Sequence, residues 1–306
     1  MKTTIKHLFP NLFERLHLCR ERYYTFLGHH WPAFLMRTWY HTLYGRRMDL
    51  SHPRDIDEKT SWMKLHADMS LWTRCADKYE VRSYVEECGL GFTLNKIFGV
   101  YEHAEEINFN DLPQQFVIKT TNGGGGKNVL IVTDKTTLDI AQTIKILNHW
   151  LAEEVGYRYY EPHYINIKPR LIIEKYLKPN FGETSLIDYK FNCFDSKVYS
   201  IFMCSDRKFN ESVCYSVYDL DWKLYPEKMK EKYRTNKTYE RPRSLEKMIA
   251  YSKVLSKGIP YVRVDWYEIN GEPVFSEMTF TPGGGFQNFY TDDFRLELGQ
   301  QMRLPQ

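Results

Sequence analysis

The chain has 306 residues, of which 42% are hydrophobic and 26% charged, and its formal net charge is +3. This composition predicts a globular protein with one large domain, or two to three lobes that share a cleft. The small net charge and the lack of any Lys/Arg run argue against a nucleic-acid-binding protein. The six cysteines have no CxxC spacing, which disfavours a zinc site or a disulfide framework and predicts a cytoplasmic protein.

Residues 1–55 are predicted to form a helical N-terminal extension. Basic and aromatic residues interleave over residues 1–50, and no apolar run approaches the roughly 20 residues that a membrane span needs. No uninterrupted apolar core follows the first basic residues, so a cleavable signal peptide is not predicted. We expect these helices to pack on the main body; the alternative is an interfacial anchor that makes peripheral contact with the inner face of the membrane.

The remaining elements alternate between helices and short strands. Helical periodicity extends over residues 57–89 in two apolar stripes and returns over residues 138–151. Strands are predicted at 97–101, 116–119, 129–132, 171–174, 188–194 and 197–204. A polar surface excursion over 225–247 leads into a helix at 245–255. Because strands outnumber helices in the C-terminal two thirds, the pattern favours an α+β fold over a doubly wound parallel sheet.

A run of four glycines, Gly123 to Gly126, connects two of these strands. No helix follows the glycines and no GK[ST] closes them, so the segment is predicted to be a hairpin flap and not a P-loop. Successive glycine amides can form a nest for phosphate groups, although such hairpins are also often merely flexible. Lys119, which ends the apolar strand before the loop, needs an anionic partner.

Two acidic residues near the end of the chain form the most informative pair. Asp265 and Glu277 lie on apolar strands joined by Asn270-Gly271, a strong hairpin signal that brings the two acids side by side. A buried acid pair is costly unless a cation neutralises it, and hard oxygen ligands suit magnesium. Arg263 projects from the same strand face as Asp265. Carboxylates, metal and arginine together predict a phosphate-handling site.

The order of these features resembles the ATP-grasp superfamily of carboxylate-amine ligases. The sequence is more narrowly similar to the TupA-like branch, which is associated with teichuronopeptide and other surface-polysaccharide synthesis. Stretches that carry the closer match are Asp57-Glu58-Lys59, Trp62-Met63-Lys64-Leu65, Ala76-Asp77-Lys78-Tyr79, Lys168-Pro169-Arg170, Asp188-Tyr189-Lys190-Phe191 and Phe280-Thr281-Pro282-Gly283. The resemblance covers about residues 50 to 300 and implies an ATP-grasp fold, with the nucleotide between two α+β lobes.

The resemblance implies a set of residues that bind ATP. Lys119 would contact the α-phosphate, and the flap would close over the other two phosphates through Gly123, Gly124, Gly125 and Gly126. Glu174 and Leu177 would bracket the adenine, with the backbone at Lys175 between them, and Lys78 would reach the nucleotide from the first lobe. Either Glu183 or Asp188 would hold the ribose. The structural alternatives are a plain strand-end acid for Glu174 and a turn cap for Asp188.

It also implies a catalytic set. Asp265 and Glu277 would bind one or two Mg²⁺ ions, with Thr279 at the position where many relatives have an asparagine ligand. Arg263 would steady the transferring phosphoryl group, and the amides of the glycine run from Gly283 and Gly284 to Gly285 would stabilise an oxyanion. Two further catalytic candidates are Lys190 and Arg207, for which the alternative is a merely solvated position.

These assignments predict four segments and one reaction. The segments are the extension 1–55, an N-terminal lobe 56–112, a glycine-flap subdomain 113–178 and a C-terminal subdomain 179–306 with the metal site. We expect an ATP-dependent ligase that joins a small-molecule or glycan-linked carboxylate to an amine through an acylphosphate, in surface or capsular polysaccharide modification. The alternatives are a glycosyltransferase, for which Asp219-Leu220-Asp221 would be the metal motif, and a non-catalytic ATP-binding module. The sequence does not indicate the oligomeric state.

Overall fold

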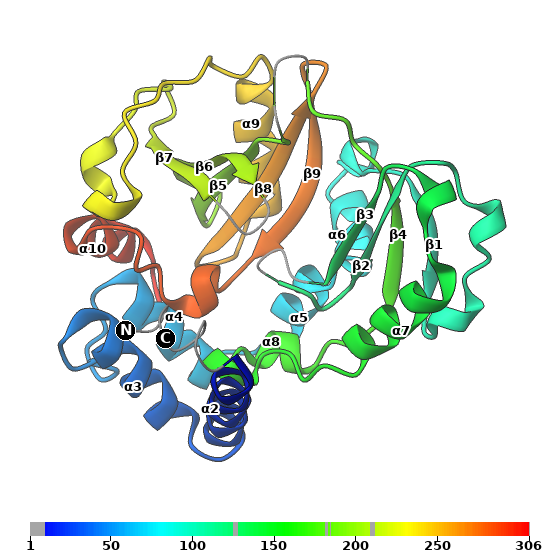
Figure 1. Ribbon diagram of the computed structural model, residues 1–306. Helices are drawn as coiled ribbons and strands as arrows, with labels where there is room; N and C mark the ends of the chain where they lie inside the picture. The colour runs from blue at the N-terminus through cyan, green and yellow to red at the C-terminus, as the bar shows by residue number, and fades with distance from the viewer. Residues whose placement is uncertain (1–9, 125–127, 181–182, 184, 209–211, 306) are drawn as a thin grey trace.

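Two antiparallel sheets lie side by side in the computed structural model, which describes residues 10–124, 128–180, 183, 185–208 and 212–305 (Figure 1). The four-stranded sheet has the order β1 (Ile97–Tyr101), β4 (Leu171–Lys175), β2 (Phe116–Thr120) and β3 (Val129–Val132). The five-stranded sheet has the order β7 (Ser212–Tyr218), β6 (Lys197–Lys208), β5 (Asp188–Phe194), β8 (Val262–Ile269) and β9 (Glu272–Thr279). This arrangement confirms the predicted α+β class, since every pair of neighbouring strands is antiparallel.

Helices surround and connect the two sheets. The N-terminal extension consists of α2 (Pro10–His30) and α3 (Pro32–Tyr44), and the segment before the first sheet contains α4 (Ile56–His66), α5 (Ser70–Ala76) and α6 (Val81–Glu87). The others are α7 (Ile140–Leu151), α8 (Pro162–Ile165), α9 (Leu245–Leu255) and α10 (Asp292–Gln301). Figure 1 shows α7 beside the four-stranded sheet, α9 against the five-stranded sheet, and α10 next to α4.

The β8–β9 hairpin forms as the sequence predicts. Asn270 and Gly271 both have positive φ, 54° and 80°, as the central residues of a type I′ turn require. The register places Asp265 directly opposite Glu277 and Arg263 opposite Thr279. All four side chains therefore lie on one face of the sheet.

Each sheet buries its other face in a separate core. Leu147 of α7 packs with Phe116, Ile118 and Ile173 of the four-stranded sheet. In the five-stranded sheet, Trp266 is fully buried and its Nε1 donates to Ser252 Oγ of α9 at 2.8 Å. Because strand residues alternate between faces, packing on α9 leaves the face with Asp265 free for polar side chains.

The main differences from the predicted elements concern short segments. The helical pattern over residues 57–89 resolves into three helices, α4, α5 and α6, where two apolar stripes predicted two. Strand β7 was not predicted, because its start lies close to a polar stretch and its alternation is short. The other predicted strands are confirmed.

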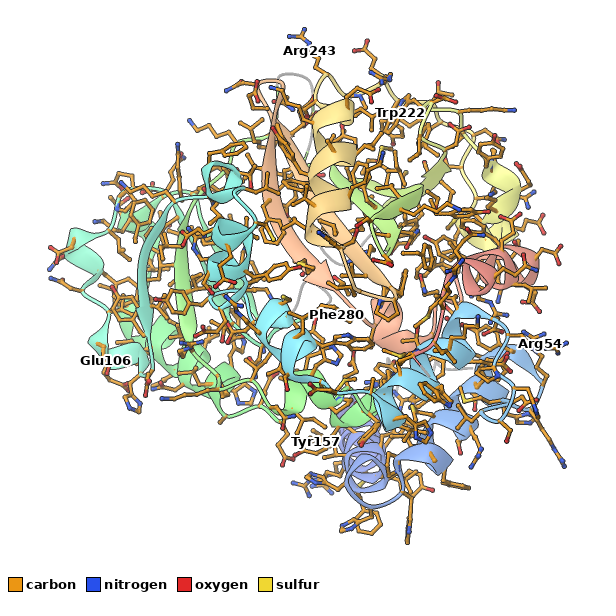
Figure 2. All side chains as sticks on the ribbon, turned by 180° about the vertical axis from the view of Figure 1, so that it is seen from behind. Arg54, Glu106, Tyr157, Trp222, Arg243 and Phe280 are labelled. Carbon is orange, nitrogen blue, oxygen red and sulfur yellow. The ribbon has the colours of Figure 1, made fainter. Side chains whose placement is uncertain are left out.

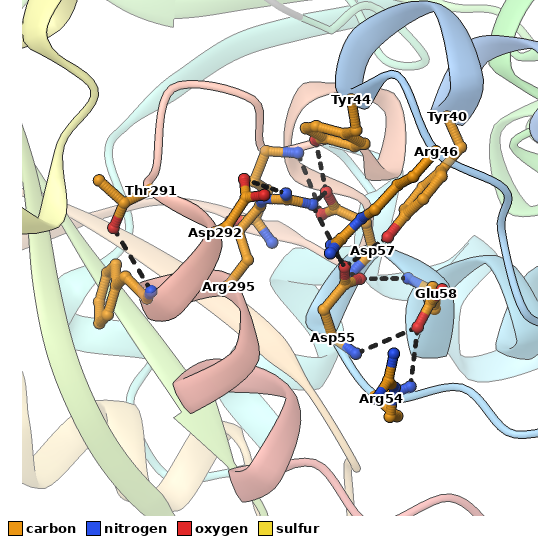
Figure 3. Close-up of polar contacts among 12 residues, drawn as sticks. Tyr40, Tyr44, Arg46, Arg54, Asp55, Asp57, Glu58, Thr291, Asp292 and Arg295 are labelled. Carbon is orange, nitrogen blue, oxygen red and sulfur yellow. Dashed lines mark hydrogen bonds and ion pairs between the residues drawn. The ribbon is translucent and has the colours of Figure 1, made fainter.

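A buried ionic network ties the N-terminal extension and the C-terminal helix to α4 (Figure 3). Arg295 of α10 is fully buried, and its Nη1 lies 3.3 Å from Asp55 Oδ2 and 3.1 Å from Asp57 Oδ2. From α3, Tyr40 donates to Asp55 and Tyr44 to Asp57, each at 2.6 Å. The expectation that the extension packs on the main body is confirmed.

Candidate functional site

Charged side chains gather on the face of the five-stranded sheet that points away from α9. Strands β5, β8 and β9 are neighbours, and their register pairs Lys190 with Asp265 and Asp265 with Glu277. Phe280, which follows β9 near the middle of the molecule (Figure 2), stacks on Trp72 of α5 at 4.8 Å. The strand ends at this point are thus held by aromatic packing.

Arg263 and Asp265 form a bidentate ion pair. Arg263 Nε donates to Oδ1 of Asp265 at 2.8 Å and Nη2 donates to Oδ2 at 2.7 Å. The same Nη2 lies 3.3 Å from Glu277 Oε1 and 3.1 Å from Thr279 Oγ1. Lys190 Nζ also donates to Asp265 Oδ2 and lies 3.5 Å from Asp188 Oδ2. Lys190 is buried, so the alternative of a solvated Lys190 is wrong.

The electrostatics of this cluster favour the charged forms of Glu277 and Lys190. Burial by itself raises the pKa of Glu277, but Lys190, Lys78 and Arg263 outweigh it and hold that pKa well below its usual range. Burial likewise lowers the pKa of Lys190, and Asp265 more than reverses the effect. Glu277, Lys190 and Arg263 are therefore all charged near neutral pH.

The donor set fits a hard divalent cation only in part. Both oxygens of Asp265 accept hydrogen bonds from Arg263, and Lys190 and Arg263 supply the positive charge that the two acids need. Lys190 and Arg263 are thus cations that neutralise the two acids in the structure, and a metal site at Asp265, Glu277 and Thr279 remains a prediction. Within the described residues, no group of three or more His, Cys, Asp or Glu side chains could hold a metal. Glu277, with a side chain about one third exposed, and the neighbouring Thr279 hydroxyl are oxygen donors of the kind that Mg²⁺ uses alongside water and phosphate.

A second charged cluster lies on the four-stranded sheet. Lys119 Nζ donates to Glu174 Oε2 at 2.7 Å, across the β2–β4 pair. Burial by itself raises the pKa of Glu174, but the charge of Lys119 lowers it by more, so the pKa lies below its ordinary value. The anionic partner that Lys119 was expected to need is thus a protein carboxylate.

Lys78 connects the two clusters. Its Nζ donates to the carbonyl of Gly123, at the start of the glycine loop, and its backbone N–H donates to Thr121 O at 3.1 Å. Burial lowers the pKa of Lys78, while Glu277 on one sheet and Glu174 on the other raise it. The ammonium group of Lys78 therefore holds the start of the glycine loop, and carboxylates of both sheets act on its charge. A Cβ added at Gly124 would meet only the Tyr164 hydroxyl, at 3.9 Å. Gly125 and Gly126 lie outside the described residues.

The second glycine run forms a left-handed turn after β9. Gly283, Gly284 and Gly285 have φ of 64°, 72° and 86°, a conformation that L side chains rarely adopt. The N–H of Gly285 donates to Thr281 O at 3.0 Å, so that amide is engaged within the turn.

A buried lysine, Lys64, is hydrogen-bonded to this turn. Its Nζ donates to Gly284 O at 2.6 Å and to Tyr159 O at 3.0 Å, and burial lowers its pKa to about 8. Thr281 Oγ1 donates to Glu161 at 2.5 Å. The sequence analysis missed Glu161, whose signal would have been an acidic residue in an otherwise aromatic segment.

The structure places the other candidate residues as follows. The N–H of Lys175 donates to Lys96 O and its carbonyl accepts from the Asn95 side chain, each at 2.8 Å, so the N–H of Lys175 is engaged within the protein. Glu183 accepts from Asn180 N at 3.1 Å and caps a turn, and the Arg207 side chain lies outside the described residues.

The Asp219-Leu220-Asp221 motif is a turn. Asp219 accepts hydrogen bonds from the backbone N–H groups of Asp221 and Lys223 at 3.0 and 2.8 Å, and from the Tyr225 hydroxyl at 3.1 Å. Its carboxylate therefore stabilises the turn, a sufficient structural reason for an aspartate at this position.

Comparisons with known proteins identify a family. The family described as TupA-like ATPgrasp matches residues 58–303. Among solved structures, the D-alanine–D-alanine ligase of Helicobacter pylori is 16% identical with a TM-score of 0.46, over 81% of this chain and 67% of that chain. The L-amino acid ligase of Bacillus licheniformis is 15% identical with a TM-score of 0.44, over 77% of this chain and 46% of that chain. No curated protein matches the chain.

Proposed function

Since the chain belongs to the TupA-like ATP-grasp family, we propose that it is an ATP-dependent ligase that joins a carboxylate to an amine. The observation that carries the proposal is the meeting of two charged clusters at one lysine. Lys119 and Glu174 on one sheet and Glu277 on the other all act on the charge of Lys78, and Glu277 in turn contacts Arg263. This arrangement supports a nucleotide held between the sheets, with its adenine near Glu174 and its γ-phosphate near Arg263.

The first chemical step is phosphoryl transfer. A carboxylate oxygen of the substrate attacks the γ-phosphorus of ATP, the bond from that phosphorus to the bridging oxygen breaks, and ADP leaves. Positioning and charge stabilisation supply most of the catalysis in such reactions. Arg263 would donate hydrogen bonds to the phosphoryl oxygens with its planar guanidinium group. Lys190 would remain bonded to Asp265 and neutralise that carboxylate when Arg263 turns toward the phosphate.

The second step forms the amide. The amine nitrogen attacks the acyl carbon of the acylphosphate, the carbon–oxygen bond to phosphate breaks, and the nitrogen gives up a proton. The turn at Gly283 and Gly284 lies four residues beyond Thr279, and its amides would stabilise the oxyanion of the tetrahedral intermediate. Lys64 fixes this turn through the carbonyl of Gly284.

Mg²⁺ would be held by Glu277 and Asp265, with Thr279 beside them, and would neutralise charge on the β- and γ-phosphate oxygens when bound. Thr279 offers one neutral hydroxyl where an asparagine offers a carbonyl. We therefore expect one tightly held ion, with a weaker second position.

We propose that one substrate is glycan-linked and that the enzyme acts in surface or capsular polysaccharide modification at the cytoplasmic side of the membrane. A cavity of about 150 Å³ beside Gly283 supports the proposal of a sugar-containing substrate, because aromatic residues line it: Trp39, Tyr159, Phe286 and Phe289. Aromatic faces of this kind pack against the apolar faces of sugar rings. A non-catalytic ATP-binding module is the second candidate, favoured only by Thr279.

Replacing Lys119 by alanine tests the nucleotide site. The variant lacks a charge-assisted phosphate donor of about 1.5 to 3 kcal/mol, so Mg-ATP affinity should fall roughly ten- to a hundredfold. Calorimetric titration measures the change, and Lys135→Ala, which removes a lysine bound to backbone carbonyls on the same lobe, is the matched control. Unchanged ATP affinity in Lys119→Ala would contradict the assignment.

The reaction itself is tested by a screen for ADP release with carboxylates and amines as paired substrates. Wild-type protein is expected to release ADP only when both substrates and Mg²⁺ are present. Glu277→Gln keeps the shape of the side chain but removes a charge, and should need much more Mg²⁺ or lose turnover. ATP binding without ADP release for any pair would favour the binding module, and normal Mg²⁺ dependence in Glu277→Gln would exclude Glu277 as a ligand.

A further inference from the structure

Large hydrophobic side chains are exposed on the N-terminal extension. Of the thirteen such side chains on the described part of the chain, five lie within seventeen residues of α2 and α3, each between 49% and 57% exposed. We call these five the aromatic ridge: Leu18, Tyr23, Phe26, Trp31 and Phe34. Single exposed apolar residues are normal on a protein surface, but a contiguous group indicates an interaction site.

Four members of the ridge, Tyr23, Phe26, Trp31 and Phe34, lie close together. The ring of Phe26 lies 5.6 Å from the ring of Trp31 and 4.6 Å from that of His30. Tyr23 precedes Phe26 by three residues in α2, and Phe34 follows Trp31 by three residues at the start of α3. Residues at this spacing share a helix face, so the ridge runs over the corner between the two helices.

The ridge is exposed although its helices are firmly attached. Leu27 and Leu35 are buried, and the backbone of Gly28 lies so close to Tyr157 O that an added Cβ would be 2.1 Å away. Tyr157, which lies against α2 (Figure 2), stacks on His29 at 3.7 Å. The two helices therefore bury one side fully and leave the ridge outside as a defined surface.

Positive charge surrounds the ridge. Residues 10–47, which cover α2 and α3, contain six arginines and two acids, Glu14 and Glu21. Glu21 pairs with Arg158 at 2.5 Å and lies 3.6 Å from Arg20, and Arg46 pairs with Asp55. Arg20, Arg22 and Arg37 are exposed close to the ridge residues. A surface with tryptophan, tyrosine and phenylalanine beside arginine suits the interface of an anionic bilayer, where the rings enter the headgroup region and the cations meet lipid phosphate and carboxylate.

We propose that the aromatic ridge docks this protein on the surface of an anionic lipid bilayer. None of the described helices is long and apolar enough to cross a membrane, so the helices would lie in the interface plane. The charge excess favours a bilayer over an apolar protein partner, which would not need exposed arginines such as Arg22 and Arg37 beside the ridge. The inference is independent of the ligase chemistry, since it uses no residue of the nucleotide site.

Vesicle co-sedimentation of the full chain tests the proposal. The protein should pellet with vesicles of phosphatidylcholine mixed with phosphatidylserine and remain in solution with phosphatidylcholine alone, and salt should release it. Trp31→Ser with Phe34→Ser should weaken binding by roughly tenfold or more, because two aromatic side chains that would be buried in the bilayer on binding are lost. Arg22→Glu with Arg37→Glu should remove the preference for anionic vesicles.

The matched control is Phe92→Ser. Phe92 is 73% exposed but lies after α6, far along the chain from the ridge, so this variant should bind vesicles as the wild type does. Thermal melts check that all variants fold. The proposal is overturned if the wild-type protein does not bind anionic vesicles, or if the ridge variant binds them as the wild type does. If the wild type self-associates without binding vesicles, and the ridge variant does not self-associate, the ridge is a protein contact instead.

Discussion

Arg263→Ala is expected to bind Mg-ATP within a few fold of the wild type and to release ADP about a hundred- to a thousandfold more slowly. The reason is that a donor aimed at the transferring phosphoryl group acts mainly in the transition state. Lys190 remains bonded to Asp265 in this variant, so the buried carboxylate keeps one cation. The measurement pairs calorimetric ATP affinity with the rate of ADP release at saturating substrates.

Two further variants make this result specific. Arg263→Lys should recover only part of the rate, because an ammonium is a point charge and cannot reproduce the fork that now holds both oxygens of Asp265. Arg241→Ala removes an exposed surface ion pair with Glu246 and should leave the rate unchanged. Should Arg263→Ala turn over at the wild-type rate, the phosphoryl-transfer site lies elsewhere.

Arg295→Ala is expected to be the most destabilising single change, with a loss of about 3 to 5 kcal/mol in the free energy of unfolding. Arg295 is fully buried between Asp55 and Asp57, and its removal leaves two buried carboxylates without their shared cation. Urea denaturation measures the effect. Arg46→Ala, which removes a 45% exposed partner of the same Asp55, should cost no more than about 1 kcal/mol.

The effect of Arg295 should also depend on pH. Burial, reinforced by Asp55, raises the pKa of Asp57 from 3.8 to about 6 even though Arg295 lowers it. The folded protein therefore binds more protons than the unfolded chain over this range, so the contribution of Asp57 to stability falls as pH rises from about 4 to 6. Without Arg295 this pKa rises further, and the stability difference from the wild type should be larger at pH 8 than at pH 5. An equal difference at both pH values would contradict a charged Asp57 as the cause.

Local signals in the sequence were enough for the family, the α+β class and the hairpin. The Asn270-Gly271 turn sets the register of β8 and β9, and register alone brings Asp265 to Glu277. The partners of these acids were not predictable in the same way. Lys190 and Asp265 are 75 residues apart, and their contact depends on β5 pairing with β8 and not with another strand. The pairing of Lys119 with Glu174 depends likewise on strand order.

The role of Asp57 shows a second limit. The stretch Asp57-Glu58-Lys59 contributed to the family resemblance, but nothing near it in sequence reveals that Arg295 is its partner. The only local signal was the cap of α4, where Asp55 accepts from the N–H groups of Asp57 and Glu58 at 3.0 and 2.9 Å. Long-range charge pairing is set by the packing of whole helices, which single-sequence periodicity does not contain.

The distance along the chain between Asp57 and Arg295, 238 residues, also constrains the order of folding. During synthesis, α4 emerges early with Asp57, whose partner Arg295 is missing until α10 has been made. Lys59 Nζ likewise donates to the carbonyls of Gly299 and Met302 at 2.7 Å, and both of these belong to the same late segment. Helix α4 therefore cannot reach its final packing before α10 has been translated, because both contacts join segments that are far apart in the sequence.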